Sequence, residues 1–157
     1  MSSVSHHNAK SLDRILVIDD LPLIPIAFQD VFRSANSAAH VDYSGNVFTA
    51  LSAKAFSNTS FDLIITGSLE AHYSTNLQQA VTELKKHFGE PRIMIYSVHY
   101  DPEIIEKMAT TGIDAYVHKY EPIEEIRKAY LQLSRGQSVI SSMFHVLYYQ
   151  YGYGVRK

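Results

Sequence analysis

The stretch that decides the fold is Arg14-Ile-Leu-Val-Ile-Asp-Asp20, near the start of the chain. Its apolar residues follow one another without alternation and stop at two acids. Runs of this kind, apolar on both faces, are typical of strands buried inside a parallel sheet. Residues 21–33 then place apolar side chains at helical spacing, with Pro22 and Pro25 where a first turn can accept them. This part of the chain therefore predicts a buried strand followed by an amphipathic helix.

The same alternation recurs along the rest of the chain. Further strand candidates, two strongly apolar and two short and weaker, are Asp62–Thr66, Arg92–Ser97, His40–Tyr43 and Ala115–His118. Helical spacing follows each of them. The expected helices are 46–56 with Asn46 as N-cap, 76–88 before Gly89, 102–111 before Gly112, and 122–134 before Gly136.

Five strand–helix units in regular order predict an α/β fold, a five-stranded parallel sheet that is doubly wound by helices on both faces. In such sheets the functional crevice lies beyond the carboxyl ends of the strands. Polar or small residues stand at four of those ends: Asp19 with Asp20, Gly67, Ser97 and Lys119. We expect these residues to line one pocket.

These strand ends resemble the receiver domains of two-component response regulators, which have the flavodoxin-like five-stranded fold. Such receivers carry an acidic pair after the first strand, an aspartate after the third, a hydroxyl after the fourth and a lysine after the fifth. Asp19-Asp20, Ser97 and Lys119 match three of these features, and Tyr116 matches the aromatic residue that swings in or out as the domain switches. The resemblance covers roughly residues 14–136.

The third strand departs from the receiver pattern. Receivers end this strand on the aspartate that accepts the phosphoryl group, whereas this chain has Asp62-Leu-Ile-Ile-Thr-Gly67. Gly67 and Ser97 are 30 residues apart (97 − 67), and Ser97 and Lys119 are 22 apart (119 − 97), as is usual between these landmarks. A shifted alignment therefore does not restore an acceptor, and the phosphoacceptor position is Gly67.

Glycine removes both the nucleophile and one carboxylate that would help to bind Mg²⁺. We expect no catalytic residue and no resident cofactor, apart from weak Mg²⁺ binding by Asp20 with Asp19. Ser68 as a different kind of acceptor and Glu70 as a fixed negative charge remain alternatives, as does an altered position 67. Both Ser68 and Glu70 are more simply interpreted as ordinary loop residues.

The retained pocket residues also have plain structural interpretations. Asp19 and Asp20 can cap the following helix, Lys119 can pair with Asp20 as a simple salt bridge, and Tyr116 can be a half-buried strand aromatic. Only the joint placement of these residues carries the resemblance.

Composition limits the function classes. The chain has 157 residues, with a formal charge of −2 and no cysteine, which gives no electrostatic footprint for nucleic acid and excludes disulfides and thiolate metal sites. No apolar run is long enough to span a membrane, so we expect a cytoplasmic protein. Residues 1–11, with His6 and His7, are expected to be a disordered leader. The histidines show no metal-binding spacing, and no glycine-rich phosphate loop is present.

The tail after residue 136 resembles the end of receivers in LuxR/NarL-type transcription factors. We expect residues 12–136 to form the receiver domain and 137–157 to be a linker helix and tail. The helix would cover residues 142–150, with Met143, Val146 and Leu147 on one face. It would lead towards a missing helix-turn-helix domain that makes any DNA contact. Tyrosines crowd the tail at positions 148, 149, 151 and 153, as is typical of an interface.

These observations favour a regulatory interaction module: an atypical receiver that controls DNA binding without phosphorylation. It would act through contacts with a partner regulator or through a homodimer that uses the face formed by residues 102–135. The alternatives are a receiver phosphorylated at an unusual residue and a domain that senses a small ligand in the vacated crevice.

Overall fold

The computed structural model describes residues 9–67 and 77–152. Its strands are β1 (Arg14–Ile18), β2 (His40–Ser44), β3 (Leu63–Thr66), β4 (Arg92–Ser97), β5 (Ala115–His118) and β6 (Val139–Ile140). Its helices are α1 (Leu23–Ala35), α2 (Val47–Ser52), the short 3-10 helix η1 (Lys54–Phe56), α3 (Leu77–His87), α4 (Pro102–Thr111), α5 (Ile123–Ser134), α6 (Ser142–Leu147) and the π-helical turn η2 (Tyr148–Gly152). The predicted alternation of strands and helices is confirmed.

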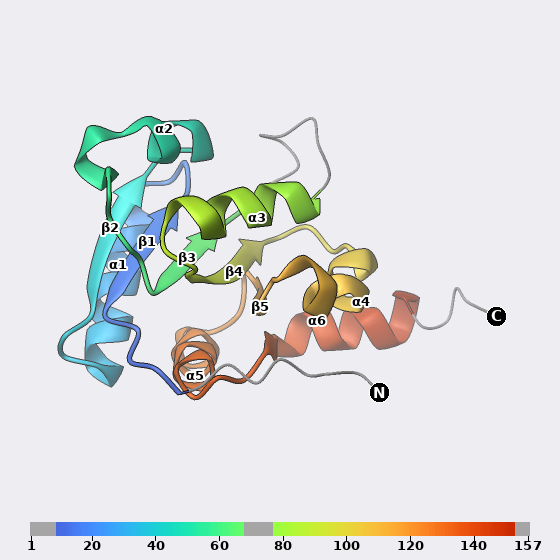
Figure 1. Cartoon of the computed structure of the whole chain (residues 1–157). Coiled ribbons are helices and arrows are strands. Elements are labelled where there is room, and N and C mark those ends of the chain that lie inside the picture. Colours follow the sequence, from blue (N-terminus) through green and yellow to red (C-terminus); the bar gives the residue numbers. More distant parts are fainter. Residues whose placement is uncertain (1–8, 68–76, 153–157) are drawn as a thin grey trace.

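All strands are parallel, in the order β2-β1-β3-β4-β5-β6 (Figure 1). Strand order reverses between β1 and β3, so the crevice between their carboxyl ends is where such sheets place a functional site. The predicted five-stranded parallel sheet is confirmed, and a short sixth strand is added to it, because Val139 and Ile140 pair with Ala115 and Tyr116 along the outer edge of β5. A two-residue strand is too short for its periodicity to be recognised in the sequence.

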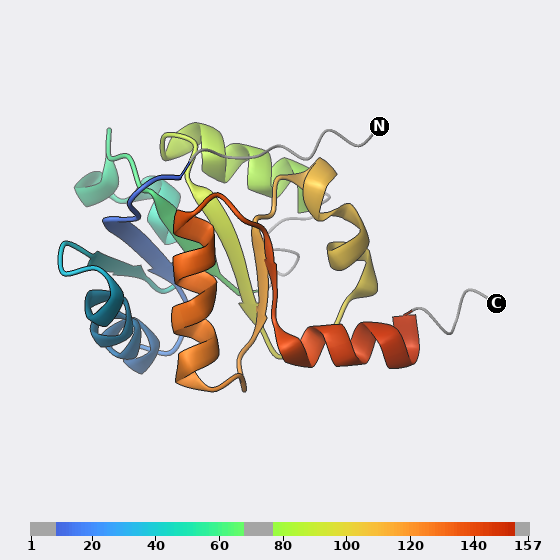
Figure 2. The same ribbon diagram turned by 90° about the horizontal axis from the view of Figure 1, so that it is seen from below.

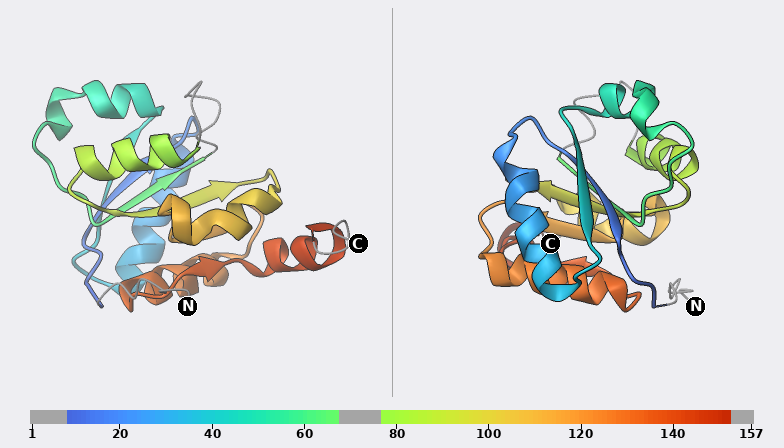
Figure 3. Two further views of the ribbon diagram at one scale, coloured as in Figure 1. Left: turned by 45° about the vertical axis from the view of Figure 1, so that its right-hand side comes forward. Right: turned by 90° about the vertical axis from the view of Figure 1, so that its left-hand side faces the viewer.

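The core lies on both faces of the sheet. Helices α1 and α5 cover one face, where residues such as Val17, Phe32 and Tyr130 are buried. Helices α2, α3 and α4 cover the other face, over residues such as Leu16 and Ile95 (Figure 3). Strands β3, β4 and β5, and β1 after Arg14, are buried on both sides, whereas the edge strand β2 is mostly exposed or half-buried.

Local sequence signals explain most helix boundaries. Asn46 caps α2, since its side chain accepts a hydrogen bond from the Thr49 amide at 2.8 Å. Gly112 ends α4 in the left-handed conformation, with φ of 79°. The first helix begins at Leu23 rather than Leu21, because Pro22 takes the N-cap position. The predicted helix over 46–56 is two pieces, α2 and η1, with the chain extended at Ala53.

The segment after Gly136 packs against the sheet, although we predicted a linker there. We call residues 138–152 the C-terminal arm. It contains β6, α6 and η2, and α6 runs out past the edge of the sheet (Figure 2). The side chain that anchors α6 is Phe144, which is fully buried. Of the three residues predicted to share one face of this helix, Met143 and Leu147 are half-buried and Val146 is 54% exposed.

The other end of the chain also differs from the expected leader. Lys10 donates its amide to the Ser134 carbonyl at 2.8 Å and pairs through Nζ with Asp62 at 2.8 Å. The chain is therefore already packed against the domain at Lys10, before the predicted boundary at Leu12, while residues 1–8 lie outside the described residues. Among the described helices, none combines the length and the apolar character needed to cross a membrane.

Candidate functional site

The sheet topology brings the predicted pocket residues together. A hollow of about 310 Å³ opens at the carboxyl ends of β1, β3, β4 and β5. Its lining residues are Ile18, Asp19, Asp20, Gly45, Thr66, Gly67, Tyr96, Ser97, Val98, His99 and Lys119. All five residues predicted for the pocket are among them. Ser68 and Glu70, the alternative acceptor and charge, lie outside the described residues.

Asp19 and Lys119 form the polar centre of this hollow. Asp19 directly follows β1 and is 7% exposed, and its Oδ2 accepts from Lys119 Nζ at 2.9 Å. Its Oδ1 accepts from the Leu21 amide at 2.9 Å. Both carboxylate oxygens are therefore engaged within the chain. The predicted partner of Lys119 was Asp20, but Asp20 is exposed and the ion pair is made with Asp19.

Ser97 and Tyr96 form the β4 wall of the hollow. The Ser97 hydroxyl is buried and accepts a hydrogen bond from the His99 amide at 3.0 Å. Tyr96 donates its hydroxyl to the Lys119 carbonyl at 3.2 Å, and Lys119 Nζ lies 5.7 Å from the Tyr96 ring centroid, within cation–π range. Burial, and then the negative charge of Asp19, raise the pKa of the Tyr96 hydroxyl. Tyr96 therefore stays neutral and helps to hold the lysine.

Gly67 leaves room for a side chain. Among the described residues, a Cβ atom built on Gly67 would meet only the Tyr96 carbonyl oxygen, at 3.9 Å, which is ordinary van der Waals contact. The backbone there is not in the left-handed region that favours glycine. Neither packing against the described residues nor backbone conformation requires glycine at this position. Its effect is chemical: it removes a carboxylate from the hollow.

The donor set for Mg²⁺ is poor. Receivers gather acidic side chains around this ion, but Asp19 is taken by Lys119 and the Leu21 amide, and Gly67 offers no oxygen from a side chain. In residues 9–67 and 77–152, no three acidic or histidine side chains come close enough together to hold a metal. The residues of this hollow do not fit a built magnesium site.

Tyr116, the predicted switch aromatic, is fully buried and points inward from β5. Its hydroxyl donates to the His99 carbonyl at 2.5 Å and accepts from the Asp101 amide at 3.0 Å. Its ring stacks on Phe144, with centroids 3.8 Å apart and planes at 15°. Sequence reasoning identified Tyr116 but missed Phe144, whose only signal is an apolar residue three positions before Leu147 in a short helix.

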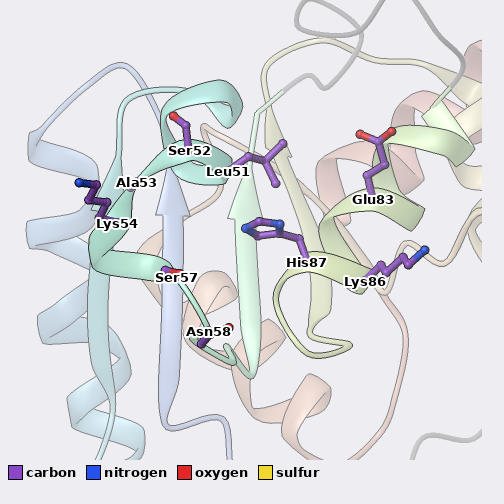
Figure 4. A pocket seen from close by; sticks show the side chains of 9 residues that line it. All are labelled: Leu51, Ser52, Ala53, Lys54, Ser57, Asn58, Glu83, Lys86 and His87. Carbon is purple, nitrogen blue, oxygen red and sulfur yellow. The ribbon is translucent and has the colours of Figure 1, made fainter.

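A larger hollow, of about 660 Å³, lies between η1 and α3, away from the strand ends (Figure 4). Its two lysines, Lys54 and Lys86, point to opposite sides, and both are exposed. Because its charged groups do not converge, we assign it no chemistry. The candidate site is the smaller hollow at the strand ends.

Comparisons with known proteins agree with this geometry. No sequence-family profile matches the chain, and no curated protein sequence matches it. Solved structures do match. A LuxR-family DNA-binding response regulator from Silicibacter pomeroyi is similar over 80% of this chain and 93% of its own, with 20% identity and a TM-score of 0.63.

Two further structures extend the likeness. One is the isolated receiver domain of RcsB from Salmonella enterica serovar Typhimurium with the phosphomimetic BeF3-, at 17% identity and a TM-score of 0.65, covering 90% of this chain and 99% of that one. The other is a LuxR-family two-component response regulator from Aurantimonas sp. SI85-9A1, at 19% identity and a TM-score of 0.67, covering 87% and 94%. The chain therefore has the fold of a response-regulator receiver domain.

Proposed function

We propose that this chain is a regulatory interaction module of two-component-type transcription control that works without a phospho-aspartate. The observation that carries the proposal is Gly67 at the carboxyl end of the central strand β3, facing Ser97 and Lys119 across the hollow. Without a carboxylate there, the hollow lacks the oxygen nucleophile that a receiver would phosphorylate. The chain is then a binding protein rather than an enzyme.

The ion pair of Asp19 with Lys119 supports this proposal. In a phosphorylated receiver the lysine would hold phosphoryl oxygens. Here Lys119 Nζ lies 2.9 Å from a carboxylate that is itself 7% exposed, so the lysine charge is balanced within the chain. An entering anion would have to break this pair. The hollow is thus stable as it stands, with no phosphoryl group needed to complete it.

The partners that we propose are a DNA-binding output domain, a second copy of the chain or a related regulator. A solved structure of two RcsB dimers bound to two parallel DNAs is similar to this chain over 67% of the RcsB chain. The homodimer face predicted at 102–135 is altered by the C-terminal arm, because β6 occupies the outer edge of β5. A dimer through this face would have to use α4, α5 and the arm. Sedimentation velocity over a concentration series would detect such a dimer.

The direct test of the proposal is incubation with acetyl phosphate and Mg²⁺, followed by intact-mass measurement. We expect no gain in mass for the natural chain and for Gly67→Ala, the matched control that adds a side chain without a carboxylate. Gly67→Asp should gain one phosphoryl group, because a Cβ atom fits there without a clash. A stoichiometric gain in the natural chain would contradict the proposal.

If the natural chain did gain a phosphoryl group, hydroxylamine would identify the kind of acceptor. An acyl phosphate on a carboxylate such as Glu70 is cleaved by hydroxylamine, whereas a phosphate ester on Ser68 is not. The hydroxylamine treatment therefore distinguishes phosphorylation at an unusual acceptor from the main proposal. The ligand-sensing alternative is separated by thermal shift: a small anion that fits the 310 Å³ hollow would raise the Tm of the natural chain, but not of Lys119→Met.

A further inference from the structure

The C-terminal arm is bonded directly to the strand that carries Tyr116. The Ser141 amide donates to the Tyr116 carbonyl at 2.9 Å, and the His118 amide donates to the Ser141 hydroxyl at 3.1 Å. The Met143 amide donates to Glu121 Oε1 at 2.6 Å, and Glu121 is itself buried. These bonds fix the start of α6 against β5 and the loop after it.

Phe144 adds aromatic packing contacts to these hydrogen bonds. Its ring lies 3.8 Å from the Tyr116 ring, 5.0 Å from the His118 ring and 6.3 Å from the Tyr100 ring, measured between centroids. Phe144 and Tyr116 are both fully buried. An outward rotation of Tyr116 would open a void beside Phe144 and lose the stacked contact, so the arm holds the tyrosine in its inward position.

The inward tyrosine in turn holds the loop between β4 and α4. The Tyr116 hydroxyl accepts from the Asp101 amide, and Asp101 is the N-cap of α4. The same hydroxyl donates to the His99 carbonyl. His99 and Val98 line the hollow at Gly67, and the His99 amide bonds to Ser97 Oγ. A continuous chain of contacts therefore runs from the arm to one wall of the hollow.

We propose that the C-terminal arm is an internal lock: Phe144 keeps Tyr116 inward, and Tyr116 thereby sets the conformation of the loop formed by residues 98–101. In this chain the loop is controlled from the arm side by packing. The arm is also the part of the chain nearest to any output domain after it, so movement of the arm would reach the hollow, and occupation of the hollow would reach the arm.

Hydrogen exchange of the Asp101 amide, followed by NMR, tests this lock. This amide donates to the Tyr116 hydroxyl, so its protection reports the inward tyrosine. We expect Phe144→Ala to speed its exchange by about tenfold or more, while amides of β1 such as Val17 keep their protection. Val146→Ala, on the exposed side of the same helix, is the matched control and should change neither rate.

Two further variants keep the test decisive if Phe144→Ala does not fold. Phe144→Leu keeps apolar bulk but removes the stacked ring, and it should speed Asp101 exchange by a smaller factor. Tyr116→Phe removes the acceptor itself and should release the amide fully. Unchanged Asp101 exchange in a folded Phe144→Ala or Phe144→Leu variant would overturn the lock. So would an unprotected Asp101 amide in the natural chain. None of these readouts depends on phosphorylation, so the lock can fail while the proposed function holds, and the reverse.

Discussion

The hollow at the strand ends and the outer edge of β5 are stabilised by different kinds of interaction. At the strand ends, the hollow beside Gly67 is polar, partly open and centred on a single ion pair between Asp19 and Lys119. At the outer edge of β5, Tyr116 and Phe144 are fully buried and stacked, and hydrogen bonds tie the arm in place. The side that carries the predicted pocket is open to solvent in part, whereas the side that carries the predicted switch aromatic Tyr116 is tightly packed by a segment we expected to be a linker.

This difference indicates which region of the molecule can adopt two alternative conformations. A hollow without a nucleophile can hold a ligand but cannot form the covalent bond that would drive a change of state. A docked aromatic contact can exist in two arrangements, docked and undocked, because packed cores are bistable rather than continuously deformable. Removing groups on the two sides should therefore have unequal effects.

The largest effect is expected on the arm side. Phe144→Ala should lower the free energy of unfolding by about 3 kcal/mol, because it empties a fully buried aromatic site. Urea denaturation followed by circular dichroism measures this. Val146→Ala should stay within about 0.5 kcal/mol. Equal losses in the two variants would mean that the arm is not docked through Phe144.

A smaller loss is expected from the ion pair in the hollow. Lys119→Met should cost about 2 kcal/mol, because it leaves the Asp19 carboxylate, 7% exposed, with the Leu21 amide as its one remaining partner among the described residues. Asp19→Asn combined with Lys119→Met should recover part of that loss. A double-mutant cycle in urea measures the coupling, which we expect to be about 1–2 kcal/mol. Strictly additive losses would argue against the pair.

Removing the hydroxyl of Tyr100 should increase stability, unlike the two substitutions above. Among the described residues its buried hydroxyl has no hydrogen-bond partner, so Tyr100→Phe should raise stability at neutral pH by about 1 kcal/mol. Thermal unfolding of the two proteins side by side tests this. A lower Tm for the phenylalanine variant would show that the hydroxyl is satisfied in solution.

We expect alkaline pH to lower the free energy of unfolding through the ionisation of Tyr100, which packs against the C-terminal arm. Burial, followed by Tyr148, Glu106 and Asp101, raises the pKa of Tyr100 above its ordinary value near 10. A raised pKa in the folded state means that stability is fully present below the ordinary value and is lost as pH rises towards the folded pKa. The fall above about pH 10 should be shallower in Tyr100→Phe, as urea midpoints at several pH values would show. Identical slopes would contradict the burial of this hydroxyl.

The smallest effect is expected at Gly67. Gly67→Ala should change stability by no more than about 0.5 kcal/mol, because its Cβ atom meets, within the described parts of the chain, only the Tyr96 carbonyl oxygen at 3.9 Å. A loss above about 2 kcal/mol would show that glycine is required by packing after all. The expected result would mean that glycine at position 67 matters because it lacks a carboxylate, and not because of packing.

Much of the fold could be predicted from the sequence because its signals are local. The apolar runs before Asp19 and Ser97 gave the buried strands, and Asn46 and Gly112 gave helix ends. The pocket residues could be assembled because parallel strands bring their carboxyl ends to one edge. These inferences need only periodicity and one rule of topology.

The rest depended on contacts between distant residues. The choice of Asp19 rather than Asp20 as the partner of Lys119 follows from which carboxylate turns inward after β1. The role of Phe144 follows from the two-residue strand β6, which places α6 against Tyr116. Neither has a periodic signal, and it was the resemblance to LuxR/NarL-type receivers that predicted a linker after Gly136.

The most direct test of the central claim is a titration with beryllofluoride and Mg²⁺ followed by amide NMR of Gly67, Ser97 and Lys119. Beryllofluoride imitates an acyl phosphate by bonding to a carboxylate oxygen at the acceptor position. The natural chain should show no saturable shift at these amides, whereas Gly67→Asp should saturate with one equivalent bound. Saturation of the natural chain at one equivalent, with shifts centred on these three residues, would contradict the claim that the pocket has lost its acceptor.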